Sequence, residues 1–351
     1  MTLHRYAPAA LRILAIAVAY YVAARLGLLL ALVRGQVTPL WPPTGIAMFA
    51  LLVWGVRVWP GITLGALLVN LPIGPSVPDV LLIAAGNTAA PVVAYVLLTR
   101  TGFRMELDHL RDALAMVFFG AFGGALISAT VGSLALVRAG AVPADRYWAT
   151  WSVWWTGDAM GLLVVTPLLL VARTVRWPLF DSWRRWVEAI ALLVSTTTAV
   201  VVVALSHLPM LFLVFPLLIW AAVRFQQLGA TPCAFIVSTV TTFAVAHGSQ
   251  FAALGPVQQM VALQAFNGSV VLTALLLSVL VAERNIAHRA IQRAVGQLSD
   301  ALARQGTDRT LLRGSLLSQG VVEDARSYDR PPAVPRRETD PPQHGGPPLL
   351  E

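Results

Sequence analysis

Long runs of apolar residues, separated by short polar segments, fill most of the chain between residues 8 and 282. A run of about 20 apolar residues is long enough to cross a bilayer as a helix. The pattern predicts apolar segments at about 9–33, 44–56, 58–70, 79–99, 113–137, 151–171, 187–206, 208–223, 230–246 and 260–282. We therefore expect an all-α, polytopic integral membrane helix bundle with about 8–10 transmembrane segments.

The stretch Thr38–Asn70 departs from the pattern of an ordinary spanning helix. It contains four prolines, which remove backbone donors and disfavour helix continuation, at positions 39, 42, 43 and 60. Gly61 and Gly65 have the spacing that lets two helices pack closely. We predict two short helices, Thr44–Val56 and Val58–Asn70, that form either two thin spans or a re-entrant hairpin. Because broken helices at membrane depth need cover from protein or a cavity, this stretch is a candidate site.

The character of the chain changes after Ala282. We divide the chain into a membrane domain over 1–282, a cytoplasmic juxtamembrane helix over 283–305 and a tail over 306–351. Apolar residues recur at helical spacing in 283–305, which favours a short exit helix that could pair with a second copy. The tail is rich in proline and polar residues, and we expect it to be disordered, with no second folded domain.

The distribution of arginine predicts how the chain is oriented in the membrane. The chain is 57% hydrophobic and carries a net charge of +8, and the excess of arginine lies on the membrane part. Arginine-rich loops mark the cytoplasmic side of a membrane protein, so this excess predicts orientation and not nucleic-acid binding. The loops Arg100–Asp112 and Arg173–Arg185 fall on that side, and both termini are then cytoplasmic in a bacterial inner membrane.

Asp158 lies in the apolar segment Trp151–Pro167. A carboxylate in such a segment costs about 2.5–3.5 kcal/mol on insertion scales, so it should face the bundle interior, a partner or water. Three roles stay open: a ligand or proton-responsive site, a helix cap near the outer interface, or an ion pair with Arg25.

Other polar and aromatic residues extend this candidate site. Two asparagines at membrane depth either bond across helices or join a polar patch with Asp158, and the tryptophans either anchor the interface or line a pocket. The candidate ligand site comprises Trp41, Pro42, Pro43, Gly45, Trp59, Asn70, Asn87, Trp155 and Asp158.

The sequence lacks the motifs that several kinds of chemistry require. The six histidines are scattered, without metal-ligand spacing, and the single cysteine, Cys233, excludes an internal disulfide or a thiolate cluster. No glycine-rich phosphate loop, H-E-x-x-H or G-x-S-x-G motif occurs. We therefore expect no enzymatic activity, no cofactor and no bound metal.

Several segments together resemble a known family. They read LWPPTGIA at 40–47, GVRVWPGITLGALLVN at 55–70, GN at 86–87, WWTGDAMGLLVVTP at 154–167, FPLLIWAAVRF at 215–225 and VAERN at 281–285. Over about 11–284 the chain resembles the membrane-associated sensor domain of the MASE type, the first of that series.

This resemblance implies an inner-membrane sensory module that passes a signal through a juxtamembrane helix to a histidine kinase, diguanylate cyclase or phosphodiesterase domain. No output domain is recognisable after Glu283, so we expect the receiver to be a separate cytoplasmic signalling partner or a second copy in a homodimer. The expected partners are the lipid bilayer and an unknown small ligand. The alternatives are a small-solute membrane transporter, which also uses broken helices near a carboxylate, and a non-catalytic membrane scaffold.

Overall fold

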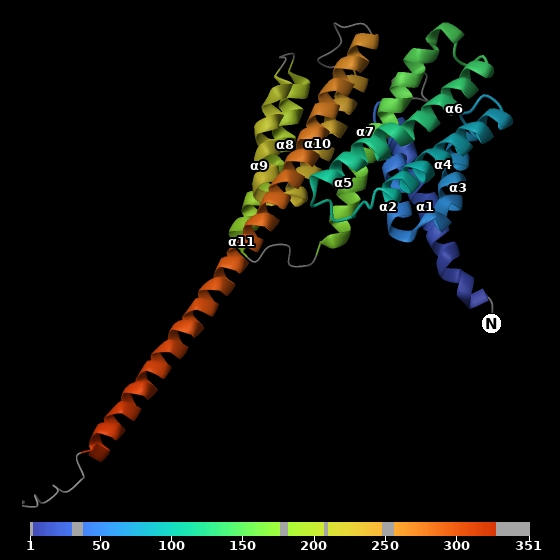
Figure 1. Cartoon of the computed structure of the whole chain (residues 1–351). Helices are drawn as coiled ribbons and strands as arrows, with labels where there is room; N and C mark the ends of the chain where they lie inside the picture. The colour runs from blue at the N-terminus through green and yellow to red at the C-terminus, as the bar shows by residue number, and fades with distance from the viewer. Residues whose placement is uncertain (1–2, 30–37, 176–181, 207–209, 248–255, 328–351) are drawn as a thin grey trace, which may run out of the picture. The chain divides into compact units, whose positions relative to one another are not determined.

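The structure, a computed structural model, describes residues 3–29, 38–175, 182–206, 210–247 and 256–327 (Figure 1). All regular elements within these ranges are helices, which confirms the all-α fold. By its contacts the chain divides into two compact units, Met1–Ile286 and Ala287–Glu351. The predicted end of the first segment at residue 33 and the part of the predicted tail after residue 327 lie outside the described residues.

The ten predicted apolar segments correspond to ten helical stretches. The α-helices are α1 (Leu3–Leu28), α2 (Pro42–Trp54), α3 (Trp59–Asn70), α4 (Val77–Arg100), α5 (Leu110–Ala115), α6 (Gly124–Arg138), α7 (Tyr147–Thr174), α8 (Trp183–Leu205), α9 (Val214–Phe225), α10 (Gln227–Ala246) and α11 (Pro256–Ser327). Short η1 (Val56–Val58), η3 (Ala144–Arg146) and η4 (Leu211–Leu213) precede α3, α7 and α9, and the π-helical η2 (Met116–Gly123) joins α5 to α6. Among the described residues, seven helices are long and apolar enough to cross a membrane.

The broken stretch forms as predicted. The two prolines at 42 and 43 begin α2, where a missing backbone donor costs nothing. Gly55 then takes a positive φ of 78° and ends α2, and the turn around Arg57 leads into α3. At 13 and 12 residues, α2 and α3 each extend about 20 Å. Each is therefore shorter than the ~30 Å hydrocarbon core.

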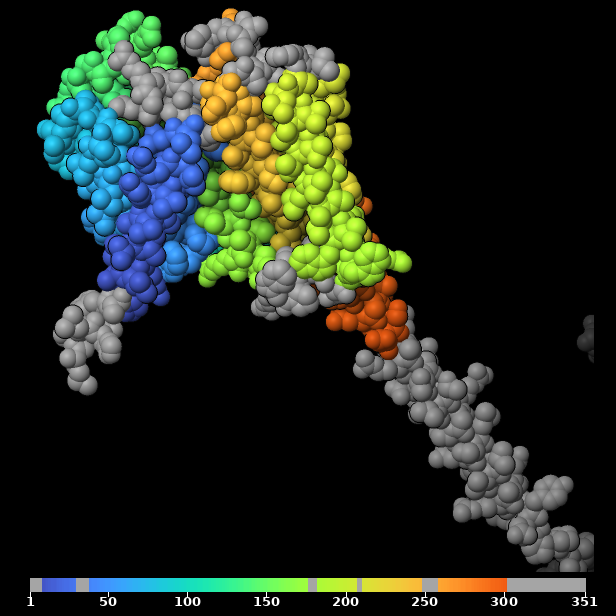
Figure 2. Space-filling view, turned by 180° about the vertical axis from the view of Figure 1, so that it is seen from behind, coloured from blue at the N-terminus to red at the C-terminus, as the bar shows by residue number. Residues whose placement is uncertain are grey.

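Apolar side chains cover the outside of the first unit, as a bilayer requires. On α1 the exposed residues include Leu11, Leu14, Val18, Val22 and Leu26. Figure 2 shows α1 in blue and the yellow-green α8 on this outer face. A soluble monomer rarely exposes apolar surface of this extent, so these faces are read as lipid-facing.

The interior of the first unit has two main apolar clusters. One joins α2, α4, α6 and α7, and the other joins α8, α9 and α10. α11 belongs to both, because Val271 and Leu275 enter the first cluster and Val270 and Ala274 enter the second. Cys233 is fully buried in the second cluster, in agreement with its apolar surroundings in the sequence.

α11 continues further than the sequence analysis predicted. Its helix runs to Ser327, so residues 306–327 are helical where a disordered tail was expected. No proline occurs between residues 257 and 330, so nothing in the backbone chemistry ends the helix at 305. The prediction gave too much weight to the composition of the last 24 residues, which lie outside the described ranges.

Candidate functional site

The two motifs around Trp41 and Asp158 meet inside the first unit. α7 packs against α2 and the residues just before it. A Cβ added at Gly157 would collide with the Thr38 carbonyl, and one added at Gly161 would collide with the Trp41 carbonyl. The Trp41 backbone N–H donates to the Gly157 carbonyl over 3.0 Å. The glycines of α7 therefore allow a backbone-to-backbone contact that no other residue type would permit.

Asp158 lies at the centre of this contact and is 2% exposed. The Thr44 hydroxyl donates to Asp158 Oδ1 over 2.6 Å, and the Ser128 hydroxyl donates to Oδ2 over 2.5 Å. The Trp154 side chain, one helical turn earlier, provides a further polar contact. Because Asp158 is twelve residues into α7, it is not a helix cap. Arg25 is exposed on α1 and makes none of the ion pairs found among the described residues.

A pocket opens beside this carboxylate. Its empty space is about 520 Å³, which includes space open to the surroundings. The lining residues are Thr38, Trp41, Asn70, Ile73, Gly74, Ile83, Asn87, Leu136, Trp154 and Asp158. Tyr20 of α1, buried behind the lining, has polar contacts with Trp41 and Asn87. Helices α3, α4, α6 and α7 and the segment that precedes α2 thus converge on a single space.

The structure brings four of the nine predicted site residues into this pocket: Trp41, Asn70, Asn87 and Asp158. Three more, at positions 42, 43 and 45, belong to the start of α2, where Pro42 and Gly45 lie against α7. The other two tryptophans lie elsewhere. Trp59 is 48% exposed at the start of α3. The Trp155 indole donates to the Phe122 carbonyl in the π-helical segment over 3.0 Å and stacks on Trp151.

Sequence reasoning missed Thr44, Ser128 and Trp154. The signal for Trp154 was available, since it lies four residues before Asp158 and thus on the same face of α7. Trp155 is rotated by about 100° from that face. Thr44 and Ser128 carry no comparable signal, because hydroxyls in membrane helices usually bond to their own backbone.

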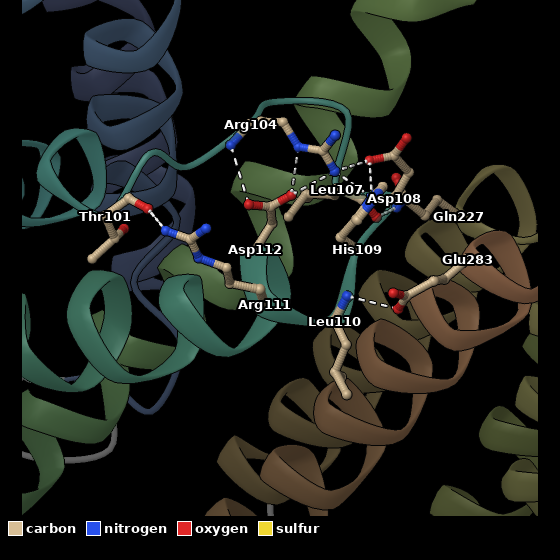
Figure 3. A network of polar contacts seen from close by, with 10 residues as sticks. All are labelled: Thr101, Arg104, Leu107, Asp108, His109, Leu110, Arg111, Asp112, Gln227 and Glu283. Atoms are coloured by element: carbon tan, nitrogen blue, oxygen red, sulfur yellow. Dashed lines mark hydrogen bonds and ion pairs between the residues drawn. The ribbon is translucent and has the colours of Figure 1, made fainter. Parts of the chain in front are cut away.

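A second polar cluster lies at the other end of α4, in the connection from α4 to α5 (Figure 3). Arg104 donates from Nε to Asp112 over 3.1 Å and from Nη2 to Asp108 over 2.7 Å. Gln227 at the start of α10 donates to the Leu107 carbonyl. The Leu110 backbone N–H, which begins α5, donates to Glu283 Oε2 of α11 over 3.2 Å. We call this last hydrogen bond the Glu283 clasp.

Unusual backbone conformations occur at this cluster. Among the described residues other than glycine, only Leu107 and Gln226 have positive φ, at 49° and 53°. Each adjoins the Gln227–Leu107 hydrogen bond, and Leu107 is fully buried. Left-handed conformations of non-glycine residues cost about 1–3 kcal/mol and tend to gather at switch regions. A residue in such a conformation, Leu107, thus lies three positions before the Leu110 amide of the clasp.

Asp108, His109 and Asp112 place three potential metal-ligand atoms close together in this cluster. The Arg104 guanidinium already pairs with both carboxylates. A second cation would have to displace it, so these residues form an ion-paired network and supply no argument for a metal.

α11 also touches the neighbourhood of the pocket. The Gln264 side-chain amide donates to the Pro39 carbonyl over 2.9 Å, next to the pocket-lining Thr38. Farther along, Asn267 exchanges hydrogen bonds with Thr241 and Thr242 of α10, at 2.9 and 3.1 Å. One helix therefore contacts the pocket side at Gln264 and the clasp at Glu283.

Comparisons with known proteins agree with this architecture. A family model described as MASE1 matches residues 12–285. The chain is 29% identical over 211 residues to a protein of Escherichia coli (strain K12) named as a probable diguanylate cyclase, DgcE. That match covers 56% of this chain but only 18% of the relative. No solved structure matches.

Proposed function

This chain belongs to the MASE1 family of membrane-associated sensor domains, and we propose that it detects a small ligand in the Asp158 pocket and relays occupancy through α11. It is a multi-pass membrane protein by its apolar helices. The sensory role is the role of the family. The ligand in the Asp158 pocket and the relay through α11 are the parts that we propose. Under this proposal the chain has no catalytic site of its own.

One observation gives the proposal its main support: α11 is hydrogen-bonded both beside the pocket and at the clasp, the two places that a relay has to connect. Gln264 holds the carbonyl beside the pocket, and Glu283 holds the α5 amide. The two residues are about 28 Å apart along the helix axis. Between them, α11 packs tightly in both apolar clusters, so a displacement at one end moves the other.

The proposed mechanism follows from these contacts. A ligand beside Asp158 moves the segment 38–41, because that segment lines the pocket and lies directly on α7. Pro39 passes the movement to Gln264, and α11 shifts relative to α5. The Glu283 clasp then opens or closes, which gives the bundle two states with different ligand affinity.

The arginines support an orientation for this relay. Arg100, Arg104, Arg111 and Arg284 all lie near the clasp in sequence, and Arg173 of α7 contacts Met105 there. Basic residues favour the cytoplasmic side, so we place the clasp and both termini in the cytoplasm of a bacterial cell and the pocket toward the outside. The receiver is then a second copy of the chain or a separate cytoplasmic signalling partner that reads α11.

Hydrogen–deuterium exchange on the full chain in nanodiscs tests the relay. Asp158→Asn perturbs the pocket with almost no change in shape, and the readout is exchange in the peptide that contains Leu110, at the clasp. Asp145→Asn, on an exposed segment outside the pocket lining, is the matched control. We expect Asp158→Asn to change exchange at Leu110 by at least threefold and Asp145→Asn to leave it unchanged.

A reciprocal variant makes the test stricter. Coupling between two sites is mutual, so Glu283→Gln should alter the exchange of residues 38–45, whereas Asp300→Asn on the same helix should not. Equal exchange at the clasp in the wild type and Asp158→Asn, together with unchanged exchange of 38–45 in Glu283→Gln, would show that the two ends are independent and would remove the sensor mechanism.

A further inference from the structure

We propose that the Asp158 pocket takes a small organic cation, a substituted ammonium compound. The inference rests on the proposed function only in treating this pocket as the sensing site. Two observations support the inference: the charge balance of the buried acids, and the chemistry of the groups that line the pocket.

Three carboxylates are buried among the residues that the structure describes: Asp79, Asp112 and Asp158. Arg138 pairs with Asp79 over 2.5 Å, and Arg104 pairs with Asp112 over 3.1 Å. The third is different, because the groups that touch Asp158 are two hydroxyls and an indole, all neutral. Burial of a charge is expensive unless an opposite charge accompanies it. Within the described ranges, Asp158 is the buried acid whose counter-charge is absent, and a cationic ligand would supply it.

The rest of the lining also suits a cation. Trp41 and Trp154 place aromatic rings at the pocket, and the face of an indole attracts an ammonium group. Asn70 uses its amide N–H to bond the Ala66 carbonyl, and Thr38 uses its hydroxyl hydrogen to bond the Leu40 carbonyl. Both side chains therefore offer oxygen acceptors to a ligand. Among the residues that the structure describes, no arginine or histidine lines the pocket, so an anion would meet the Asp158 carboxylate without compensation from these residues.

The position of the pocket bears on where the cation comes from. The α3–α4 connection contributes Ile73 and Gly74 to the lining, so the pocket lies near the end of the bundle and not at its centre. A substituted ammonium group can be free in solution or belong to a lipid headgroup, and the test separates these sources.

The test measures binding to the full chain in dodecyl maltoside micelles, which contain no ammonium group. The probes are choline, ethanolamine and putrescine, with 3,3-dimethylbutan-1-ol as the neutral isostere of choline and glutarate as an anion. We expect at least one ammonium probe to bind at least tenfold more tightly than the neutral alcohol and glutarate. Asp158→Asn should lower that affinity at least tenfold, and Asp145→Asn should not change it.

Two further measurements identify the source of the ammonium group and test whether an arginine of the chain occupies the site instead. Phosphatidylethanolamine added to the micelles should compete with the ammonium probe if a lipid headgroup is the ligand, and should leave its affinity unchanged if the ligand is free in solution. Arg34 lies outside the described residues. If its side chain were the missing counter-charge, Arg34→Gln would tighten probe binding at least tenfold, which would overturn the assignment of the site to an external cation.

The outcomes separate this inference from the proposed function. If no ammonium probe binds more tightly than the neutral alcohol, the cation inference fails, even if Asp158→Asn does not fold, because that comparison uses the wild type alone. If an ammonium probe binds but leaves exchange at Leu110 unchanged, the ligand class holds and the relay fails. Accumulation of the probe inside proteoliposomes would support the ligand class and replace the sensor with a transporter.

Discussion

Gly161→Ala tests the contact that builds the pocket. In an open helix position, alanine is more stable than glycine by about 1 kcal/mol. At Gly161 the added Cβ would meet the carbonyl oxygen and carbon of Trp41 and the nitrogen of Pro42, all of them backbone atoms. Backbone cannot rotate away as a flexible side chain can, so α7 and the segment 38–42 must separate.

The size of the effect follows from these contacts. Overpacking costs about 1–3 kcal/mol, with larger values where nothing can yield. Separation also weakens the hydrogen bond from Trp41 to Gly157, which is worth about 1 kcal/mol. After the propensity gain of about 1 kcal/mol, we expect Gly161→Ala to destabilise the protein by about 1–3 kcal/mol. The variant should also lose ligand binding, because Asp158 and Trp41 no longer keep their spacing.

Gly268→Ala is the matched control. Gly268 lies in α11, and an added Cβ there has no neighbour within 4 Å. The same substitution should therefore leave stability unchanged or raise it by up to about 1 kcal/mol. The assay is thermal unfolding of both variants in the same nanodiscs, followed by tryptophan fluorescence. If Gly161→Ala were as stable as Gly268→Ala, the close contact between α7 and the Trp41 segment would be wrong.

Three other perturbations have defined outcomes. Asn267→Val should lower stability by about 1 kcal/mol, since it removes two interhelical hydrogen bonds while the threonines of α10 keep their bonds to helix carbonyls; unfolding in micelles measures this. Arg138→Gln should lower the melting temperature because it removes the cation that pairs with Asp79, and the double variant with Asp79→Asn should recover most of the loss. Trp154→Leu should weaken binding of the ammonium probe at least threefold, whereas Trp155→Leu should lower the melting temperature and leave that affinity unchanged.

The sequence contained most of the fold because the membrane imposes simple rules. Apolar runs marked the ten helical stretches, and the prolines and Gly55 marked the break between α2 and α3. The spacing of Gly61 and Gly65 indicated a close helix contact, and both glycines lie against α1. The sequence pattern did not indicate where α11 ends. Residues 306–327 are mostly polar, but they contain no proline and they form a helix.

The candidate site could be predicted only as far as local spacing reaches. Trp41 and Asp158 were identified because each is an unusual residue in its own segment. That they share a pocket depends on Gly157 and Gly161, which admit the Trp41 backbone. This pairing joins segments more than 100 residues apart, and one sequence cannot reveal it.

The Glu283 clasp is also a contact between distant segments, and the sequence analysis missed it. An acid at the end of a span normally faces water. Its partner is a backbone amide, which leaves no trace in residue type: any residue other than proline at position 110 could donate this bond. A relay built on such a contact is therefore found only from the fold, and variants of Glu283 test it more directly than variants of Leu110.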